Sequence, residues 1–236
     1  MGDSTVKRVI TAGLSMTIPA ILLLGHSNSG KSPVGEALAR TFSTSTHRLK
    51  HLDFGEHLRR TMAGSFDAGL LGDEMAYLRE VMNGRLLDDD HFSIARKVIL
   101  RFLSVHDLNH GGTVVLNGMP RHAGQARDVR DMGVDVRLVI VLECSPEIAW
   151  QRKCASERGQ GHEDRGTRDD RGRDVFERRV ASYGQETAPL ISWYSDAGVA
   201  VVRAAIDVDT TPESVVELAR AWVARVQLVG GAPRTL

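Results

Sequence analysis

The segment from Gly25 to Ser32 constrains the fold of this chain more than any other feature. It reads GHSNSGKS and fits the pattern G-x-x-x-x-G-K-[ST], with an apolar run, Ile18–Leu24, before it and a segment of helical length, Pro33–Thr41, after it. In such a strand–loop–helix unit, glycines let successive backbone N–H groups point into one concavity, and the lysine reaches the β- and γ-phosphates of a nucleotide. The segment therefore predicts a phosphate loop for a nucleoside triphosphate. The residues expected to bind it are Gly25, Ser27, Asn28, Ser29, Gly30, Lys31 and Ser32.

The rest of the chain alternates between short apolar runs and longer segments with helical periodicity. The further runs typical of strands are Arg48–Asp53, Thr113–Asn117, Arg137–Leu142 and Val199–Ala204. The segments expected to be helical are Glu56–Met62, Asp73–Asn83, Asp89–Asp107, Ala123–Met132, Pro146–Ser156, Asp174–Ala197 and Thr211–Val226. Strands that alternate with helices favour a parallel sheet covered on both faces. We therefore expect a three-layer α/β fold with a parallel sheet of about five strands, whose continuous apolar runs are buried.

Composition and charge argue against several classes of protein. The 236 residues are 42% hydrophobic and 25% charged, which is a normal globular mixture. Basic and acidic residues number 30 each, so the net charge is zero and gives no overall signature for binding nucleic acid or an anionic membrane. No apolar run approaches the roughly 20 residues of a membrane-spanning helix. With two cysteines, Cys144 and Cys154, neither a four-cysteine zinc site nor a disulfide framework is possible, and we expect a cytoplasmic protein.

One segment, 157–173, differs from the rest in composition. Gly, Arg, Asp, Glu and His dominate it, and large apolar residues are missing. Such a segment cannot bury a core of its own. The composition is typical of either a mobile flap over a site or a surface loop.

Beyond the phosphate loop, several short stretches share a characteristic order and spacing. They are Gly55–Arg59 (GEHLR), Met82–Asp89 (MNGRLLDD), Asn117–Arg121 (NGMPR) with Gln125 and Ala126 after it, and Arg168–Asp170 (RDD) followed by Arg179, Tyr183 and Thr187–Leu190 (TAPL). They resemble the T-G-D-x-L-R, M-x-x-G-x-L-V-x-D-E, D-G-F-P-R-x-x-x-Q-A and R-x-D-D…R-L-x-x-Y…T-x-P-L-I motifs of the adenylate kinase and wider nucleoside monophosphate kinase family. None is decisive alone, but the combination spans about Ile18 to Val226 and is specific.

The resemblance implies Mg²⁺-dependent transfer of a phosphoryl group from ATP to a nucleoside monophosphate. Such a reaction gathers negative charges in one place, so catalysis is mostly positioning and charge neutralisation, for which the planar fork of arginine is well suited. The acceptor would be bound by Arg59, Leu87, Gly118, Arg121 and Gln125, with Gln125 reading its base. The transferred group would be surrounded by Lys31, Arg121, Arg158, Arg168 and Arg179, and Arg152 would stack on the donor base. The alternative for each arginine is a solvated surface position.

The same resemblance divides the chain into three parts. Residues 17–53, 89–156 and 174–228 would form the core, residues 54–88 an acceptor-binding insertion, and residues 157–173 a short lid. A lid that closes over the site excludes water, which would otherwise take the phosphoryl group. We expect a monomer or small homo-oligomer whose partner is a small-molecule phosphate acceptor.

Three departures from the family pattern leave the identity of this acceptor open. Ser32 stands where the family has glycine and restores the hydroxyl that binds Mg²⁺ in most phosphate-loop proteins. Asn117 replaces an acid at the end of one strand. At the end of another, Asp53 stands where the family usually has a small neutral residue, and Phe54 replaces the threonine near the acceptor base. A nucleotide phosphate is already anionic and needs no base, but an alcohol benefits from one. Asp53 is therefore a candidate base or, with Ser32, a candidate Mg²⁺ ligand.

The sequence thus supports one favoured function and two alternatives. We favour an ATP-dependent kinase acting on an AMP-like nucleoside monophosphate. The first alternative is a kinase of the same fold that phosphorylates a non-nucleotide metabolite, with Asp53 as base. The second is a nucleotide-binding module with little catalysis, which the retained arginines argue against. Among the nine histidines, His26 lies inside the phosphate loop, and a surface or phosphate-adjacent role is expected rather than a metal site.

Overall fold

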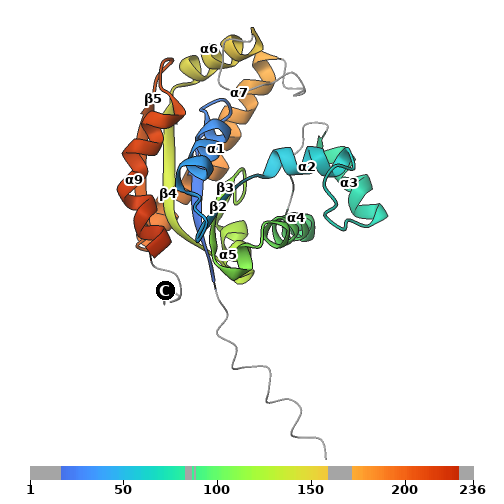
Figure 1. The fold of residues 1–236 in the computed structure, drawn as a ribbon. Coiled ribbons are helices and arrows are strands. Elements are labelled where there is room, and N and C mark those ends of the chain that lie inside the picture. Colours follow the sequence, from blue (N-terminus) through green and yellow to red (C-terminus); the bar gives the residue numbers. More distant parts are fainter. Residues whose placement is uncertain (1–16, 83–86, 88, 159–171, 229–236) are drawn as a thin grey trace, which may run out of the picture.

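The computed structural model describes residues 17–82, 87, 89–158 and 172–228. These residues contain one sheet of five parallel strands in the order β2–β3–β1–β4–β5, which confirms the predicted class (Figure 1). The strands are β1 (Ile18–Leu24), β2 (Arg48–Asp53), β3 (Gly112–Asn117), β4 (Val134–Cys144) and β5 (Ala200–Ile206). Each lies at a predicted apolar run, and β4 extends beyond its predicted run at both ends.

Nine α-helices are present in the described part of the chain. They are α1 (Lys31–Phe42), α2 (Phe54–Met62), α3 (Gly72–Met82), α4 (Phe92–Val105), α5 (Ala123–Asp131), α6 (Pro146–Glu157), α7 (Arg173–Ser182), α8 (Pro189–Asp196) and α9 (Pro212–Leu228). Local chemistry sets several of their starts. Asp53 caps α2 by accepting from the backbone N–H of Glu56, and Ser145 caps α6 in the same way.

Two segments that the sequence predicts as single helices are divided. The first, Asp89–Asp107, begins as a 3-10 turn at Asp89–His91 and becomes α-helical only from Phe92. The second, Asp174–Ala197, consists of α7, a π-helical turn at Tyr183–Thr187, and α8. Pro189 has no backbone N–H and cannot continue the α-helical ladder, so the chain rearranges before it.

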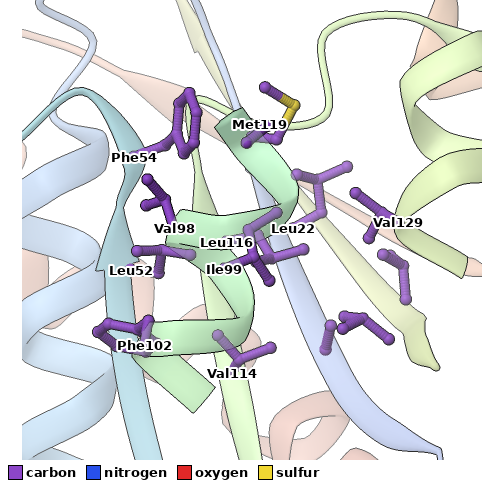
Figure 2. Close-up of a cluster of buried hydrophobic side chains, with 14 of the residues drawn as sticks. Leu22, Leu52, Phe54, Val98, Ile99, Phe102, Val114, Leu116, Met119 and Val129 are labelled. Carbon is purple, nitrogen blue, oxygen red and sulfur yellow. The ribbon is translucent and has the colours of Figure 1, made fainter. Parts of the chain in front are cut away.

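Two hydrophobic clusters cover the two faces of the sheet, because successive residues of β1 point to opposite sides. Leu22 belongs to the cluster with α4, α5 and α8, and Leu23 to the cluster with α1 and α9. Figure 2 shows the first cluster, in which residues of β1, β2 and β3 meet α4. Its members include Leu22, Leu52, Leu116, Val98, Ile99 and Phe102, none more than 2% exposed. Burying each such side chain stabilises the fold by about 1.5–3 kcal/mol, which makes the sheet a rigid base.

The carboxyl ends of the central strands form the platform on which polar residues gather. In the sheet register Asp53 of β2 lies opposite Asn117 of β3, and Asn117 also lies opposite Leu23, one residue before the end of β1. Helices α2 and α3 extend to one side of this platform, and α6 and α7 lie across the end of the sheet (Figure 1). Among the described residues, no helix combines the length and the apolar composition that crossing a membrane requires.

Candidate active site

The phosphate loop joins β1 to α1 and has the backbone that its glycines allow. Gly25 and Gly30 have φ values of +151° and +95°, a region that residues with side chains rarely adopt. A Cβ on Gly25 would lie 2.5 Å from Ser29 Oγ and 3.0 Å from the carbonyl oxygen of Leu142. Helix α1 begins directly at Lys31, so its first N–H groups and its dipole are available to an anion.

The side chains of the loop fit the polyphosphate of a nucleotide. Lys31 Nζ donates to the carbonyl oxygens of Gly25 (2.6 Å) and His26 (2.7 Å), both within the loop. Asn28 Oδ1 and Ser29 Oγ are buried with no hydrogen-bond partner among the described residues. Leaving a buried polar group unpaired costs about 1–3 kcal/mol. A phosphate oxygen would accept from the Ser29 hydroxyl, so the loop leaves a donor for an anion to satisfy.

Ser32, Asp53 and Asn117 form a hydrogen-bonded group beside this loop. Asp53 Oδ2 accepts from Ser32 Oγ at 2.6 Å and from Asn117 Nδ2 at 3.1 Å. Asn117 Nδ2 also lies 3.2 Å from Ser32 Oγ. The other carboxylate oxygen, Asp53 Oδ1, caps α2 through Glu56 N–H at 3.0 Å, which fixes the side chain. The acid at the end of β2 and the amide at the end of β3 are therefore in direct contact with each other and with Ser32.

The same group of residues fits a magnesium ion. The Ser32 hydroxyl and the Asp53 carboxylate are hard oxygen donors, and Mg²⁺ in nucleotide sites usually takes one or two protein oxygens together with phosphate oxygens and waters. Within the described ranges, no cluster of three or more His, Cys, Asp or Glu residues could hold a metal ion by itself. A magnesium ion at Ser32 and Asp53 would therefore take its remaining ligands from a bound nucleotide and water.

A cavity of about 640 Å³ brings together several residues predicted to bind the acceptor. Its walls come from three separate stretches of chain, and they are Leu87, Asp90, Arg121, His122, Ala123, Gln125, Gln185, Glu186, Pro189, Leu190 and Trp193. Of the five predicted acceptor residues, Leu87, Arg121 and Gln125 line this cavity. Gly118, three residues before Arg121 in the chain, has a φ of +87°. A Cβ added to Gly118 would lie 3.7 Å from the Cβ of Phe54.

Arg121 is held in place by its own loop. Its backbone N–H donates to Gln125 Oε1 at 3.0 Å, and its Nε donates to the carbonyl oxygen of Gly118 at 3.1 Å. Burial and the nearby guanidinium of Arg179 lower the pKa of Arg121, whereas the carboxylate of Glu186 opposes the shift. An arginine stays charged under these conditions. Arg121, after β3, therefore lies within electrostatic reach of Arg179 on α7 and of Glu186 in the π-helical turn.

The sequence prediction missed Gln185, Glu186 and Trp193 as cavity residues. Gln185 and Glu186 lie in the π-helical turn, and π-helical turns frequently occur at functional sites. A continuous helix, as expected from periodicity, would place these two side chains differently. The sequence feature that could have indicated them is their position between Tyr183 and Thr187, which belong to the last of the family-like motifs.

The remaining predicted residues lie elsewhere. Arg59 pairs with Glu56 on α2, with Nη2 and Nε at 2.7 and 3.0 Å from Oε2. Arg152 Nη1 donates to the carbonyl oxygens of Asp207 (2.7 Å) and Thr210 (3.1 Å), and its Nη2 would lie 3.1 Å from a Cβ on Gly30. It thus connects the phosphate loop to the β5–α9 loop. Arg158 is exposed after α6, and Arg168, with most of the predicted lid, falls outside the described residues.

Comparison with known proteins finds adenylate kinases among the chains similar to this one. No family model matches the chain. An adenylate kinase from Synechococcus sp. (strain WH7803) is 29% identical over 187 residues, which cover 77% of this chain and 87% of the relative. One from Bifidobacterium longum (strain NCC 2705) is 27% identical over 188 residues, covering 77% and 89%. The chain is thus similar to these two adenylate kinases over about three quarters of its length.

The likeness of this chain to a solved structure concerns the fold alone. A gluconokinase from Sinorhizobium meliloti 1021 superposes with a TM-score of 0.50 at 15% identity, over 90% of this chain and 95% of that chain. The fold is therefore that of the P-loop kinases.

Proposed function

We propose that the chain is a Mg²⁺-dependent kinase that transfers the γ-phosphoryl group of ATP to a nucleoside monophosphate, with an AMP-like acceptor favoured. The observation that carries the proposal is the cavity that brings together Leu87, Arg121 and Gln125, in a chain that also has a phosphate loop. A short chain of contacts links the two. Arg121 binds the carbonyl oxygen of Gly118, and the preceding residue, Asn117, binds Ser32 of the loop. The cavity volume lies within the range of small-molecule sites.

On the donor side, the phosphate loop binds and orients the triphosphate. The backbone N–H groups and Ser29 donate to its oxygens, and Lys31 exchanges its two carbonyl contacts for the β- and γ-phosphates. Ser32 and Asp53 would hold the Mg²⁺ ion, which neutralises charge on the phosphate oxygens when it is bound. Arg152, anchored to the β5–α9 loop, covers the loop near Gly30.

On the acceptor side, Gln125 and Leu87 position the base, and arginines take the phosphate. Arg121 is preorganised by the Gly118 carbonyl, and Arg179 lies close enough to lower its pKa. Arg59 must break its ion pair with Glu56 before it can bind the acceptor phosphate. A partly exposed ion pair of this kind costs only about 0–1 kcal/mol to break. Positive charge is thus placed in advance where it would offset charge on the transferred group, which is how enzymes of phosphoryl transfer gain most of their rate.

A second candidate function rests on Asp53. Its Oδ2 already accepts a hydrogen bond from one alcohol, Ser32 Oγ at 2.6 Å, beside the phosphate loop. A carboxylate in this place could accept the proton of an attacking substrate hydroxyl. This candidate is a kinase of the same fold that phosphorylates a hydroxylated metabolite.

The two candidates are separated by a survey of acceptors. ADP release is measured with ATP and Mg²⁺ against AMP, CMP, UMP, GMP, their deoxy forms, and a set of hydroxylated metabolites. The Lys31→Met variant, purified in parallel, shows any activity of contaminating host kinases. We expect turnover with one monophosphate, AMP first. Turnover only with a hydroxylated compound would replace the proposal by the second candidate. Nucleotide binding without transfer to any acceptor would contradict both.

A further inference from the structure

His26, inside the phosphate loop, is fixed between two strand ends. It is 7% exposed, although loop residues are usually solvated. Its Nε2 lies 2.7 Å from the carbonyl oxygen of Cys144 at the end of β4, and its Nδ1 lies 2.9 Å from the carbonyl oxygen of Ser27. These two contacts, one within the loop and one with β4, fix the orientation of the ring.

The edge of this ring meets two aromatic side chains of another element. His26 forms edge-on contacts with Phe176 of α7 (6.3 Å between centroids, 80° between planes) and with Tyr183 of the π-helical turn (6.1 Å, 72°). Both geometries are of the attractive T-shaped kind. These contacts join the phosphate loop to α7, the helix that begins at the last residue of the predicted lid.

Helical spacing places Arg179 on the face of α7 that His26 supports. Phe176, Arg179 and Tyr183 are separated by three and four residues, and residues at this spacing share one side of a helix. Tyr183 continues the α-helical backbone, with φ −57° and ψ −47°. The charge of Arg179 also acts on Arg121, whose pKa it lowers. His26 thus contacts, from the phosphate loop, the helix that carries Arg179.

We propose that His26 is a positioning residue that sets Arg179 relative to the bound triphosphate. The proposal rests on the proposed function, since Arg179 must act on the transferred group. A loop residue without a ring would lose both edge-on contacts, whereas the contact of Phe176 with Trp150 of α6 (5.4 Å between centroids) would remain. His26 therefore couples the position of Arg179 to the loop.

A double-mutant cycle tests this coupling. His26→Asn removes the ring, and we expect kcat to fall about tenfold while the Kd for ATP stays within about twofold, a coupling in the range found for residues that act through each other. In an Arg179→Ala background the same change should lower kcat no further. His26→Phe, which keeps an edge-on ring, should recover most of the loss. Trp222→Leu, which changes an exposed ring on α9, is the matched control and should leave kcat unchanged.

Several results would overturn the proposal. They are an equal loss in both backgrounds, a loss of ATP affinity that matches the loss of kcat, and a failure of His26→Phe to recover activity. Amide hydrogen exchange gives a readout that does not depend on catalysis: His26→Asn should speed exchange in α7 relative to α9. If the wild-type protein transfers phosphate to no acceptor, the proposed function fails. Faster exchange in α7 of His26→Asn would then still show that His26 supports this helix. Unchanged exchange would refute it.

Discussion

The donor and acceptor sides of the site are built in different ways. The phosphate loop is one continuous segment, Gly25–Ser32, whose shape is determined by its glycines and by the start of α1. The acceptor cavity is assembled from residues 87–90, 121–125 and 185–193, which meet only when the sheet and its covering helices have packed. A local segment can be recognised from its pattern, whereas a cavity depends on the whole fold. The two sides should therefore respond separately to substitution.

Removing the loop cation should have the largest effect. Lys31→Met deletes the ammonium that reaches the phosphates but keeps most of the side-chain volume. We expect kcat to fall about 10²–10³-fold with every acceptor, the loss found when one preorganised donor is removed from a transition-state site. The measurement is ADP release at saturating ATP and acceptor. The melting temperature should stay close to that of the wild type, which would show that the loop still folds.

A small loss of activity in Lys31→Met would contradict the role of Lys31 in binding the phosphates of the donor. The current contacts of Lys31 with the Gly25 and His26 carbonyl oxygens would then be structural. A loss confined to one acceptor would also contradict the assignment, because the donor is common to all.

The second-largest effect should be specific to the acceptor. Arg121→Ala removes a charged group that the Gly118 carbonyl orients, and each charge-assisted hydrogen bond contributes about 1.5–3 kcal/mol. We expect kcat/KM for the acceptor to fall about 10–100-fold, with the Kd for ATP nearly unchanged. Arg127→Ala, at an exposed position of α5, is the matched control and should be neutral.

Equal losses of acceptor use and ATP affinity in Arg121→Ala would contradict the separation of the two sides. Isothermal titration with ATP alone, followed by kinetics at fixed ATP, measures both quantities on the same preparation.

The difference between the two sides also explains what could be predicted from the sequence. The strands and the phosphate loop follow from local rules, and so their positions were predicted, although β4 is longer at both ends than its predicted run. The register that brings Asp53 opposite Asn117 follows from the parallel arrangement of the sheet. The π-helical turn does not, because its geometry arises where Pro189 stops the helical ladder against packed neighbours. The edge contacts of His26 were equally hidden, since they join residues about 150 positions apart.

Asp53 should give a smaller effect that depends on magnesium. As a ligand for Mg²⁺ its replacement weakens metal binding, so in Asp53→Asn we expect the Mg²⁺ concentration for half-maximal rate to rise about tenfold, the lower end of losses for supporting metal-site residues. Saturating Mg²⁺ should restore most of kcat. Asp196→Asn, on the exposed end of α8, is the matched control.

A different result in Asp53→Asn would favour the second candidate function, a kinase that phosphorylates a hydroxylated metabolite. If kcat falls about 10²–10⁴-fold even at saturating Mg²⁺, the carboxylate acts as a general base, and the acceptor is an alcohol. The dependence of rate on Mg²⁺ is the measurement that separates the two roles.

The smallest effect should come from pH and should act on the acceptor side. His57 of α2 donates from Nδ1 to the carbonyl oxygen of Asp53 at 2.8 Å and packs edge-on against Phe66 and Phe102. Burial lowers the pKa of His57 below its ordinary value of 6.5, and the charge of Arg60 adds to this shift, although the Asp53 carbonyl opposes it.

Because the folded state holds His57 neutral, the unfolded state takes up a proton first as the pH falls below about 6.5, and stability declines from there. One titrating group changes the free energy of unfolding by at most about 1.4 kcal/mol per pH unit. In His57→Gln we expect the decline between about pH 6.5 and 5 to become shallower, with the remainder due to His47 and His106, whose pKa values are lowered by burial as well. Urea unfolding across this range measures the slope. An unchanged slope in the variant would mean that His57 is not protonated on unfolding, and that the helix bearing Arg59 is anchored to the core without a pH-sensitive contact.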